Sequence, residues 1–233
     1  DAYLNDKKIE IGISISIKNG DIIDIKNCID GNRVYLGFSA DMKLKKIFNS
    51  FSTYEKINIG GISGQKLRNN DIIYFKNIKS PSTKKIPSSF INRYDQTKII
   101  RIIEGIHFDK IQNNLTLIDN QFQISSNSDR MGLRLLNNKI KLNNYNEIDS
   151  TVVTKGTIQV PRDGNPIILM SDSQSTGGYP IIGNICKIDI SKITQIKPNK
   201  RVKFKIITID ESNRILDYEL KKFKSKLDIN LST

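Results

Sequence analysis

The part of the sequence best suited to chemistry is a polar cluster that stands directly before two glycines. The cluster follows a short apolar run and consists of Asp172, Gln174, Ser175 and Thr176. The next two residues, Gly177 and Gly178, would let the backbone approach a ligand closely and point N–H groups at an anion. The alternative is that the glycines only turn the chain and that the polar side chains cap this turn. The segment is therefore a candidate anion-binding loop.

The elements before the loop must position it, and their pattern predicts short strands. Arg162-Asp163-Gly164-Asn165 is typical of a hairpin turn, because glycine and asparagine accept positive φ angles. The apolar residues 166–170 then predict a buried strand that leads into the polar cluster. No glycine-rich motif of the GxxxxGK[ST] or GxGxxG kind is present, so the sequence does not indicate a nucleotide site within this chain alone.

Most of the C-terminal half reads as short strands. Apolar runs of strand length occupy residues 98–104, 122–125, 132–136, 157–160, 181–186 and 201–209. Residues 189–196 predict a helix of two turns. Asp210 is the predicted N-cap of a terminal helix, in which apolar residues recur at helical spacing from Ile215 to Leu227.

The N-terminal half also predicts β structure. Residues 9–17 alternate between apolar and small or polar types, the period of a half-buried strand, and residues 22–25 read as the returning strand. Residues 80–97 contain two prolines and no periodicity, which predicts a linker. We therefore expect an all-β, mainly antiparallel protein with an N-terminal unit at 1–79, the linker at 80–97, and a C-terminal unit with a terminal helix at 98–233.

The composition argues against several classes of protein. The net charge of +13 arises from lysines spread along the chain among many isoleucines and asparagines, and no nucleic-acid-binding motif is visible, so we expect no nucleic-acid partner. No apolar run reaches the length of about eighteen residues that a membrane span needs. Two distant cysteines, Cys28 and Cys186, and a single histidine predict neither a disulfide framework nor a metal site. A cytoplasmic location follows as the expectation.

Three motifs in the C-terminal half together resemble one family. They are Ser128-Asp129-Arg130-Met131-Gly132-Leu133-Arg134-Leu135, then Gly156-x-Ile158-Gln159-Val160-Pro161-x-x-Gly164-x-Pro166-Ile167, and then Asp172-x-Gln174-x-Thr176-Gly177-Gly178-Tyr179. The sequence is similar to the KipA family, whose members are described as the C subunit of 5-oxoprolinase, allophanate hydrolase subunit 2, or biotin-dependent carboxyltransferase subdomains A and B. The resemblance covers about residues 1–210.

The resemblance also exposes departures in the N-terminal half. Ala40-Asp41 stands where the family usually carries two glycines, and Asn49-Ser50-Phe51-Ser52-Thr53 stands where it carries Gly-Ser-Arg-Ser-Thr. Family members begin upstream of Asp1, so the N-terminal unit is expected to be truncated relative to the family. The implied fold is a pair of linked cyclophilin-like β-barrel subdomains.

The resemblance implies a subunit of an ATP-dependent 5-oxoprolinase, which hydrolyses 5-oxoproline to glutamate. Such a subunit would act with a KipI-like partner, of the type found as the B subunit of 5-oxoprolinase, and a LamB/YcsF-like protein, with ATP at a site shared between subunits. One alternative is a carboxyltransferase component that moves a carboxyl group from carboxybiotin to urea or a related amide. Biotin would then arrive on another protein, since no Met-Lys-Met carrier motif occurs here. Another alternative is a non-catalytic regulator that binds a KipI-like protein.

The resemblance further implies roles for particular side chains. Asp172 is the candidate hydrogen-bond acceptor or base, and Gln159 would hydrogen-bond an amide of the substrate. Further substrate-binding candidates are Arg130, Arg134, Gln174, Thr176, Gly177, Gly178 and Tyr179.

The two arginines also have a structural alternative. Arg130 and Arg134 lie on one face of the predicted strand and would bind a carboxylate or phosphate bidentately. The alternative is a structural salt bridge with Asp129 or Asp163. His107, the single histidine, is interpreted as a surface or structural residue.

Overall fold

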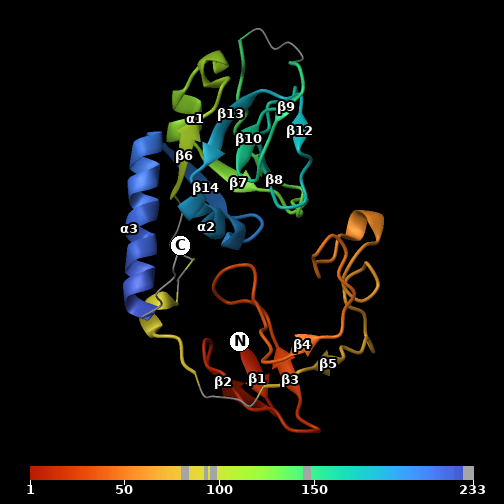
Figure 1. Cartoon of the computed structure of the whole chain (residues 1–233). Helices are drawn as coiled ribbons and strands as arrows, with labels where there is room; N and C mark the ends of the chain where they lie inside the picture. Colours follow the sequence, from red (N-terminus) through yellow and green to blue (C-terminus); the bar gives the residue numbers. More distant parts are fainter. Residues whose placement is uncertain (80–83, 92–93, 95–98, 144–147, 228–233) are drawn as a thin grey trace. The chain divides into compact units, whose positions relative to one another are not determined.

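The chain forms two units (Figure 1). This computed structural model describes residues 1–79, 84–91, 94, 99–143 and 148–227. Unit 1 comprises Asp1–Ile29 and Val34–Asn92, and unit 2 comprises Asp30–Arg33 and Arg93–Thr233. The main division falls within the predicted linker at 80–97, of which residues 80–83, 92–93 and 95–97 lie outside the described part. The segment Asp30–Arg33 was not expected in unit 2.

Gln195 holds this short segment to unit 2. Its Oε1 accepts hydrogen bonds from the backbone N–H groups of Asn32 and Arg33, at 2.8 and 2.7 Å, and its Nε2 donates to the Arg33 carbonyl at 3.1 Å. The Arg33 guanidinium also donates to the Thr194 carbonyl. One side-chain amide thus pairs with the backbone much as a neighbouring strand would, because an amide carries both a donor and an acceptor.

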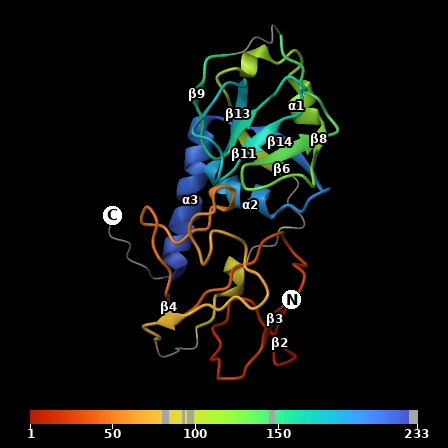
Figure 2. The same ribbon diagram turned by 90° about the vertical axis from the view of Figure 1, so that its right-hand side faces the viewer.

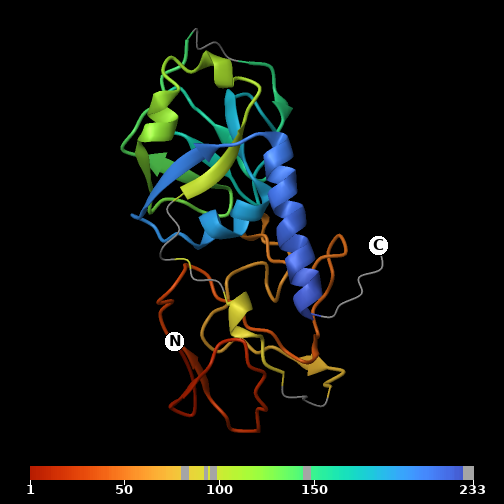
Figure 3. The same cartoon turned by 90° about the vertical axis from the view of Figure 1, so that its left-hand side faces the viewer.

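Seven strands of unit 2 close into a barrel in the order β10-β11-β8-β7-β14-β6-β13 (Figure 2). Their bounds are Ile99–Glu104 for β6, Gln121–Ile124 for β7, Gly132–Leu136 for β8, Thr157–Gln159 for β10, Ile167–Leu169 for β11, Ile181–Ile185 for β13 and Arg201–Ile206 for β14. Neighbouring strands are antiparallel except β14 and β6, which pair in parallel. Figure 3 shows β6 in yellow-green and β14 in blue within the barrel. The prediction of a mainly antiparallel β protein is confirmed.

The barrel interior is filled by every second residue of its strands. Ile100 and Ile102 of β6 are fully buried, as are Phe122 of β7 and Phe204 of β14. The rings of Phe122 and Phe204 lie with their centroids 5.6 Å apart. Alternation places these side chains on one face of each strand, so closure of the sheet gathers them into one core.

A two-stranded ribbon covers part of the outer face of the barrel. It pairs β9, Thr151–Val152, with β12, Thr176–Gly177. Beneath it lies a second, smaller apolar cluster of Val153, Leu169 and Ile181, with Ile167 packed against it. The polar cluster and glycine pair of the sequence therefore belong partly to a covering layer.

Three α-helices accompany the barrel in the described part of the chain: α1 (Leu115–Asp119), α2 (Ile190–Gln195) and α3 (Ile209–Leu227). Two 3-10 turns, η3 at Phe108–Lys110 and η4 at Lys187–Asp189, lead into other elements. The terminal helix is confirmed, but Asp210 is not its N-cap. Instead Thr208 Oγ1 accepts a hydrogen bond from the Glu211 N–H at 3.1 Å, because the helix begins two residues earlier than expected. None of the described helices combines the length and apolar character needed to cross a membrane.

Unit 1 has less regular structure. Its strands are β1 (Ala2–Leu4), β2 (Lys7–Ile9), β3 (Ile23–Ile25), β4 (Asp41–Met42) and β5 (Phe75–Lys76), and its 3-10 turns are η1 (Glu55–Ile57) and η2 (Ser88–Phe90). They form a sheet in the order β2-β1-β3 and a ribbon of β4 and β5, so the described residues of unit 1 contain no closed barrel. The predicted strand at 9–17 is wrong beyond Ile9, because Gly12 has a φ of +80°, which interrupts an extended strand.

Burial differs sharply between the two units. Every fully buried apolar side chain of the described residues belongs to unit 2. Unit 1 instead exposes large side chains such as Tyr35 and Phe48, at 86% and 95%. Since apolar burial is the main stabilising term in folding, the stability of the described chain resides mainly in unit 2.

A buried carboxylate connects β6 to the segment that contains η4 and α2. Asp189 is fully buried, and it accepts hydrogen bonds from the Arg101 backbone N–H at 2.9 Å and from Arg101 Nε and Nη2 at 2.8 and 2.6 Å. Lys192 Nζ lies 2.8 Å from the same carboxylate. Burial alone would raise the pKa of Asp189, but the hydrogen bonds from Arg101 and Lys192 outweigh it and hold the pKa below its ordinary value.

We predict that Asp189→Ala lowers the free energy of unfolding by about 3–5 kcal/mol, because it leaves the Arg101 guanidinium without its buried partner. Lys192→Met serves as the control and should cost about 1 kcal/mol or less, since Lys192 is partly exposed and Asp189 keeps Arg101. Urea denaturation followed by circular dichroism measures both values. Equal losses in the two variants would contradict a dominant role for the Arg101–Asp189 pair.

Candidate functional site

Arg130 and Asp172 form an ion pair where the β8–β11 ladder ends. The Asp172 backbone N–H donates to the Arg130 carbonyl at 2.9 Å, so the two residues continue the strand pairing. Arg130 Nε and Nη2 donate to the two carboxylate oxygens of Asp172 at 2.7 and 2.8 Å, a bidentate arrangement. The Arg130 side chain is 59% exposed and that of Asp172 is 17% exposed. The carboxylate is therefore shielded, while the guanidinium still faces solvent.

This pairing differs from the structural alternative drawn from the sequence, which named Asp129 or Asp163 as the arginine's partner. Asp129 Oδ1 instead accepts from the N–H groups of Met131 and Gly132, at 2.8 and 3.2 Å. Asp163 accepts from Asn165 N and Nδ2, at 3.0 and 2.8 Å. Both aspartates thus shape turns.

Gln159 lies beneath the β9–β12 ribbon, almost fully buried at 1% exposure. Its Nε2 donates to the Tyr179 carbonyl at 3.2 Å. A Cβ atom added at Gly177 would lie only 2.8 Å from this Nε2, so the absence of a side chain at Gly177 makes room for the glutamine amide. The glycine therefore has a packing role that the sequence did not reveal.

Residues 179–181 are fixed from two sides. On one side, Gln159 binds the Tyr179 carbonyl, and the Val160 N–H donates to the Pro180 carbonyl at 3.0 Å. On the other, His107 Nδ1 accepts from the Ile181 N–H at 3.0 Å, and the His107 N–H donates to the Ile181 carbonyl at 2.9 Å. His107 is thus a structural residue that positions the end of the candidate loop. Because Nδ1 is the acceptor, the neutral ring carries its proton on Nε2.

The other predicted site residues lie on exposed positions. Gln174 and Thr176 are exposed on the segment between Asp172 and the glycines, and Tyr179 is 45% exposed. Arg134 is exposed on β8, opposite Ile167 at the beginning of β11. Gly177 pairs with Thr151 in the ribbon.

The strand register separates the predicted residues into two places. Gln159 pairs with Ile167 at the beginning of β11, whereas Asp172 follows the other end of that strand. Arg130 and Asp172 come together at one end. Gln159, Gly177 and Tyr179 come together beneath the ribbon. The single concave site expected around the glycine loop is thus divided by the length of β11.

The first place presents an oriented guanidinium, a group that is suited to anion binding. A guanidinium has five N–H donors in a planar fork, and the Asp172 carboxylate fixes the orientation of this fork through Nε and Nη2. The Arg130 side chain is largely exposed, so a carboxylate or phosphate can reach it from solvent. The described residues contain no group of three or more His, Cys, Asp and Glu side chains placed to hold a metal ion.

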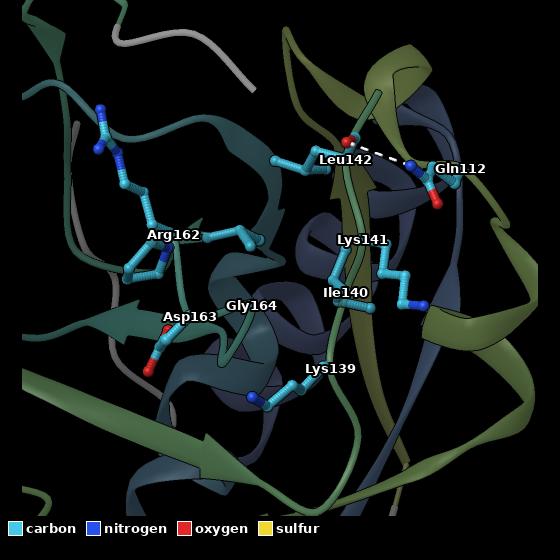
Figure 4. A pocket seen from close by; sticks show the side chains of 10 residues that line it. Gln112, Lys139, Ile140, Lys141, Leu142, Arg162, Asp163 and Gly164 are labelled. Carbon is cyan, nitrogen blue, oxygen red and sulfur yellow. Dashed lines mark hydrogen bonds between the residues drawn. The ribbon is translucent and has the colours of Figure 1, made fainter. Parts of the chain in front are cut away.

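A pocket at the opposite end of the β8–β11 ladder was not anticipated from the sequence. It is lined by residues 139–142 and 160–164, with Gln112 (Figure 4). The sequence indicated only a turn at 162–165 and did not indicate that residues 139–142 lie beside it.

Seven strands close into a barrel, and a two-stranded ribbon covers part of its outer face. The protein therefore belongs to the class of all-β barrel proteins, with an arginine–aspartate pair at a strand end. A family model described as "Carboxyltransferase domain, subdomain A and B" matches residues 1–206, and the chain belongs to this family. The expected resemblance is confirmed.

Curated relatives fall into two groups. The chain is 29% identical to the C subunit of 5-oxoprolinase from Escherichia coli over 212 residues, which cover 91% of the chain and 68% of that protein. The corresponding protein of Haemophilus influenzae is also 29% identical, over 214 residues and with the same coverage. The urea amidolyase of Saccharomyces cerevisiae is 26% identical over 86% of the chain, which spans only 12% of that enzyme.

Solved structures show the same fold. The urea amidolyase of Kluyveromyces lactis matches 96% of the chain with a TM-score of 0.87 at 21% identity, and the chain covers 15% of it. The urea carboxylase of the same organism matches 96% with a TM-score of 0.86, and the chain covers 22% of it. The chain therefore corresponds to one part of these large proteins.

We predict that Gly177→Ala lowers the free energy of unfolding by about 1–3 kcal/mol, because the new methyl group displaces the buried Gln159 amide from the Tyr179 carbonyl. The same change in a Gln159→Ala background should cost much less, since the clashing amide is gone. A double-mutant cycle from urea denaturation measures this coupling. Additive effects would show that Gln159 is not the reason for a glycine at 177.

Stability should also depend on the protonation of His107. Burial and the nearby Lys110 lower the pKa of His107 below its ordinary value of 6.5, partly opposed by Asp109. The unfolded chain therefore binds the proton first, so His107 contributes its full stability above about pH 6.5 and loses it as the pH falls below that value.

His107→Asn supplies the control, because Asn Oδ1 can accept the Ile181 hydrogen bond without titrating in this range. The free energy of unfolding of the original chain should fall relative to that of the variant between about pH 7.5 and 5.5. The chain has one histidine, so no other one complicates the comparison. Parallel pH curves for the two proteins would contradict the assigned role of Nδ1.

Proposed function

We propose that this chain is a subunit of an ATP-dependent 5-oxoprolinase, which opens 5-oxoproline to glutamate in the cytoplasm together with a KipI-like subunit and a LamB/YcsF-like protein. The observation that carries this proposal is the match to the C subunit of 5-oxoprolinase in two bacteria, over 91% of this chain and 68% of the relatives' length. The yeast urea amidolyase, in contrast, is covered over only 12% of its length.

The Arg130–Asp172 pair supports the proposal chemically. The substrate 5-oxoproline carries a carboxylate beside a planar amide, and an oriented guanidinium is well suited to bind that carboxylate. In this proposal Arg130 holds the substrate carboxylate and Asp172 is a positioning residue that fixes the guanidinium. The buried Gln159 fixes the Tyr179–Ile181 segment beside the ribbon rather than acting on the substrate itself.

ATP does not fit the glycine loop of this chain. Neither Gly177 nor Gly178 has a positive φ angle, Gly177 lies in the β12–β9 ladder, and Gln159 fills the space beside it. A phosphate cradle would instead need successive backbone N–H groups turned toward a ligand. We therefore propose that partner subunits provide most of the ATP site, and that the isolated chain has little activity.

A second candidate function is supported by the match to urea amidolyases in sequence and fold. In that case the chain would accept a carboxyl group from carboxybiotin on another protein and transfer it to urea or a related amide. Arg130 would then bind the carboxylate that is transferred. A third outcome, binding of a KipI-like protein without catalysis, is distinguished by the same experiment.

The test is ATP-dependent release of glutamate from 5-oxoproline by this chain mixed with the KipI-like and LamB/YcsF-like proteins of the same genome. We predict turnover by the mixture and little by the chain alone. Arg130→Gln should lower kcat/KM at least about tenfold through loss of a charged hydrogen-bond pair. Arg201→Gln, which removes an exposed arginine from β14, should leave it unchanged.

Other outcomes of this experiment would favour one of the two alternative functions. Transfer of carboxyl from carboxybiotin without glutamate release would favour the carboxyltransferase function. Stable binding to the KipI-like protein without either reaction would favour the regulatory one. Robust 5-oxoproline turnover by the purified chain alone would contradict the shared site.

A further inference from the structure

A two-residue turn of unit 1 carries the most exposed large apolar side chain among the described residues. The Ile47 N–H donates to the Ser50 carbonyl at 3.0 Å and the Ser50 N–H donates to the Ile47 carbonyl at 2.9 Å, which closes a tight hairpin. Phe48 and Asn49 form its tip. Phe48 is 95% exposed, so solvent reaches its ring from nearly every side.

The backbone of this turn is unfavourable for phenylalanine. Phe48 has a φ of +49° and Asn49 a φ of +60°, and positive values at both central residues are typical of a type I′ hairpin turn. Asparagine and glycine adopt such angles readily, whereas a bulky side chain rarely does. Every other non-glycine residue with positive φ in the described part of the chain is asparagine or aspartate. The turn therefore exposes an aromatic ring where asparagine or glycine would fold more easily.

The hairpin stands on a fixed base. On the arm before the turn, the Lys43 N–H donates to the Tyr74 carbonyl at 2.8 Å, directly after β4. On the arm after the turn, a Cβ at Gly60 would overlap the Ser52 carbonyl oxygen, so this arm packs closely against the glycine loop. Both arms are thus tied to other segments of unit 1. A fixed base presents the ring in one position, which reduces the conformational entropy lost on binding.

The hairpin is also basic. Lys43, Lys45 and Lys46 are exposed, and no acidic residue occurs between positions 43 and 54. Lys46 Nζ lies 5.1 Å from the centroid of the Phe51 ring, which keeps this cation beside the arm after the turn. A second copy of the chain does not suit this surface, because the chain carries a net charge of +13 and like charges repel. The surface instead suits a partner of negative charge.

The position of the ring favours a protein pocket over other acidic surfaces. A ring that solvent surrounds is fully desolvated only inside a concave apolar site, and aromatic anchors of protein interfaces fill such pockets. Single-stranded nucleic acids stack on aromatic side chains set along a groove, and membrane surfaces are bound by the broad apolar face of an amphipathic helix. A single ring at the tip of a hairpin provides neither.

We propose that Phe48 is the anchor through which this chain binds a partner subunit, by entering an apolar pocket that acidic side chains surround. The identity of the partner rests on the proposed function, which makes it the KipI-like protein. The lysines on the arm before the turn face the acidic rim of the pocket. The hairpin belongs to unit 1 and the Arg130–Asp172 pair to unit 2, so the docking element is separate from the anion site.

The test measures binding of the full chain to the KipI-like protein of the same genome by biolayer interferometry, without ATP or substrate. Phe48→Asn removes the ring and suits the positive φ, so the turn is kept. This variant should bind at least about tenfold more weakly, as expected for an anchor residue. Its melting temperature should equal or exceed that of the original chain, since a strained residue has been replaced.

Two controls separate the anchor from general stickiness and general charge. Tyr35→Asn removes another ring of unit 1, which is 86% exposed and lies outside the hairpin, and it should change the affinity less than about twofold. K43Q/K45Q should slow association and weaken its dependence on salt. K221Q/K222Q, which removes the same charge from exposed positions on α3, should do neither.

Several results would overturn the proposal. An unchanged affinity of Phe48→Asn, or an equal loss in Tyr35→Asn, would remove the hairpin from the interface while the KipI-like partner stands. A lowered melting temperature of Phe48→Asn would show that the ring serves folding.

Failure of the original chain to bind the KipI-like protein would overturn both the hairpin proposal and the assignment of that partner. Tighter binding to phosphatidylserine vesicles or to oligo(dT) would assign the hairpin to a membrane or to nucleic acid. Glutamate release by the mixed subunits tests the enzymatic function separately.

Discussion

One buried carboxylate, that of Asp189, links a strand of the barrel to the connection between β13 and β14. Asp189 receives three hydrogen bonds from Arg101, and Arg101 stands on β6 between two fully buried isoleucines. β6 is the strand at which the barrel closes in parallel pairing with β14, and Asp189 lies in the connection that leads from β13 to β14. The carbonyl of Arg101 also accepts the Cys186 N–H at 3.0 Å, so the same residue anchors the beginning of this connection. A parallel pair lacks the short hairpin that defines the register of antiparallel strands. The Arg101–Asp189 pair instead fixes β6 to the connection that leads into β14.

The C-terminal strands could be predicted because their sequences carry a strong local signal. β8 was expected at 132–136 and is found there, since alternating apolar residues face a closed core. Residues 9–17 carry an equally clear alternation, but the single positive φ of Gly12 and the absence of fully buried apolar side chains among the described residues of unit 1 leave most of it outside any strand. Periodicity predicts a strand only where a second surface exists to cover its apolar side. Sequence alone cannot show whether that surface is present.

The candidate site, too, could be predicted only in part from the sequence. The residue types near Asp172 indicated anion binding, and Arg130 does meet Asp172, because both residues extend one antiparallel ladder. Gln159 was expected to lie beside Asp172 but does not, because the three-residue strand β11 separates their positions in the register. Gly177 resembled a residue of a ligand loop, yet it faces a glutamine amide. The sequence did not indicate the pocket near Lys139, because the residues that line it come from segments about twenty residues apart, in a chain where lysine is common.

Because Gln195 binds the backbone of residues 32 and 33, one cut in the chain does not separate the two units completely. The path of the backbone enters unit 2 for four residues, returns to unit 1, and enters unit 2 again after residue 92. A gene cut at the linker would give a barrel without those four residues, with the Gln195 amide and the Thr194 carbonyl left to bind water. The two units are thus interleaved along the gene, and simple end-to-end joining of two independent domains would not produce this path. Residues 30–33 supplied as a separate peptide, or through a circularly permuted gene, would restore these hydrogen bonds to a barrel that stands alone.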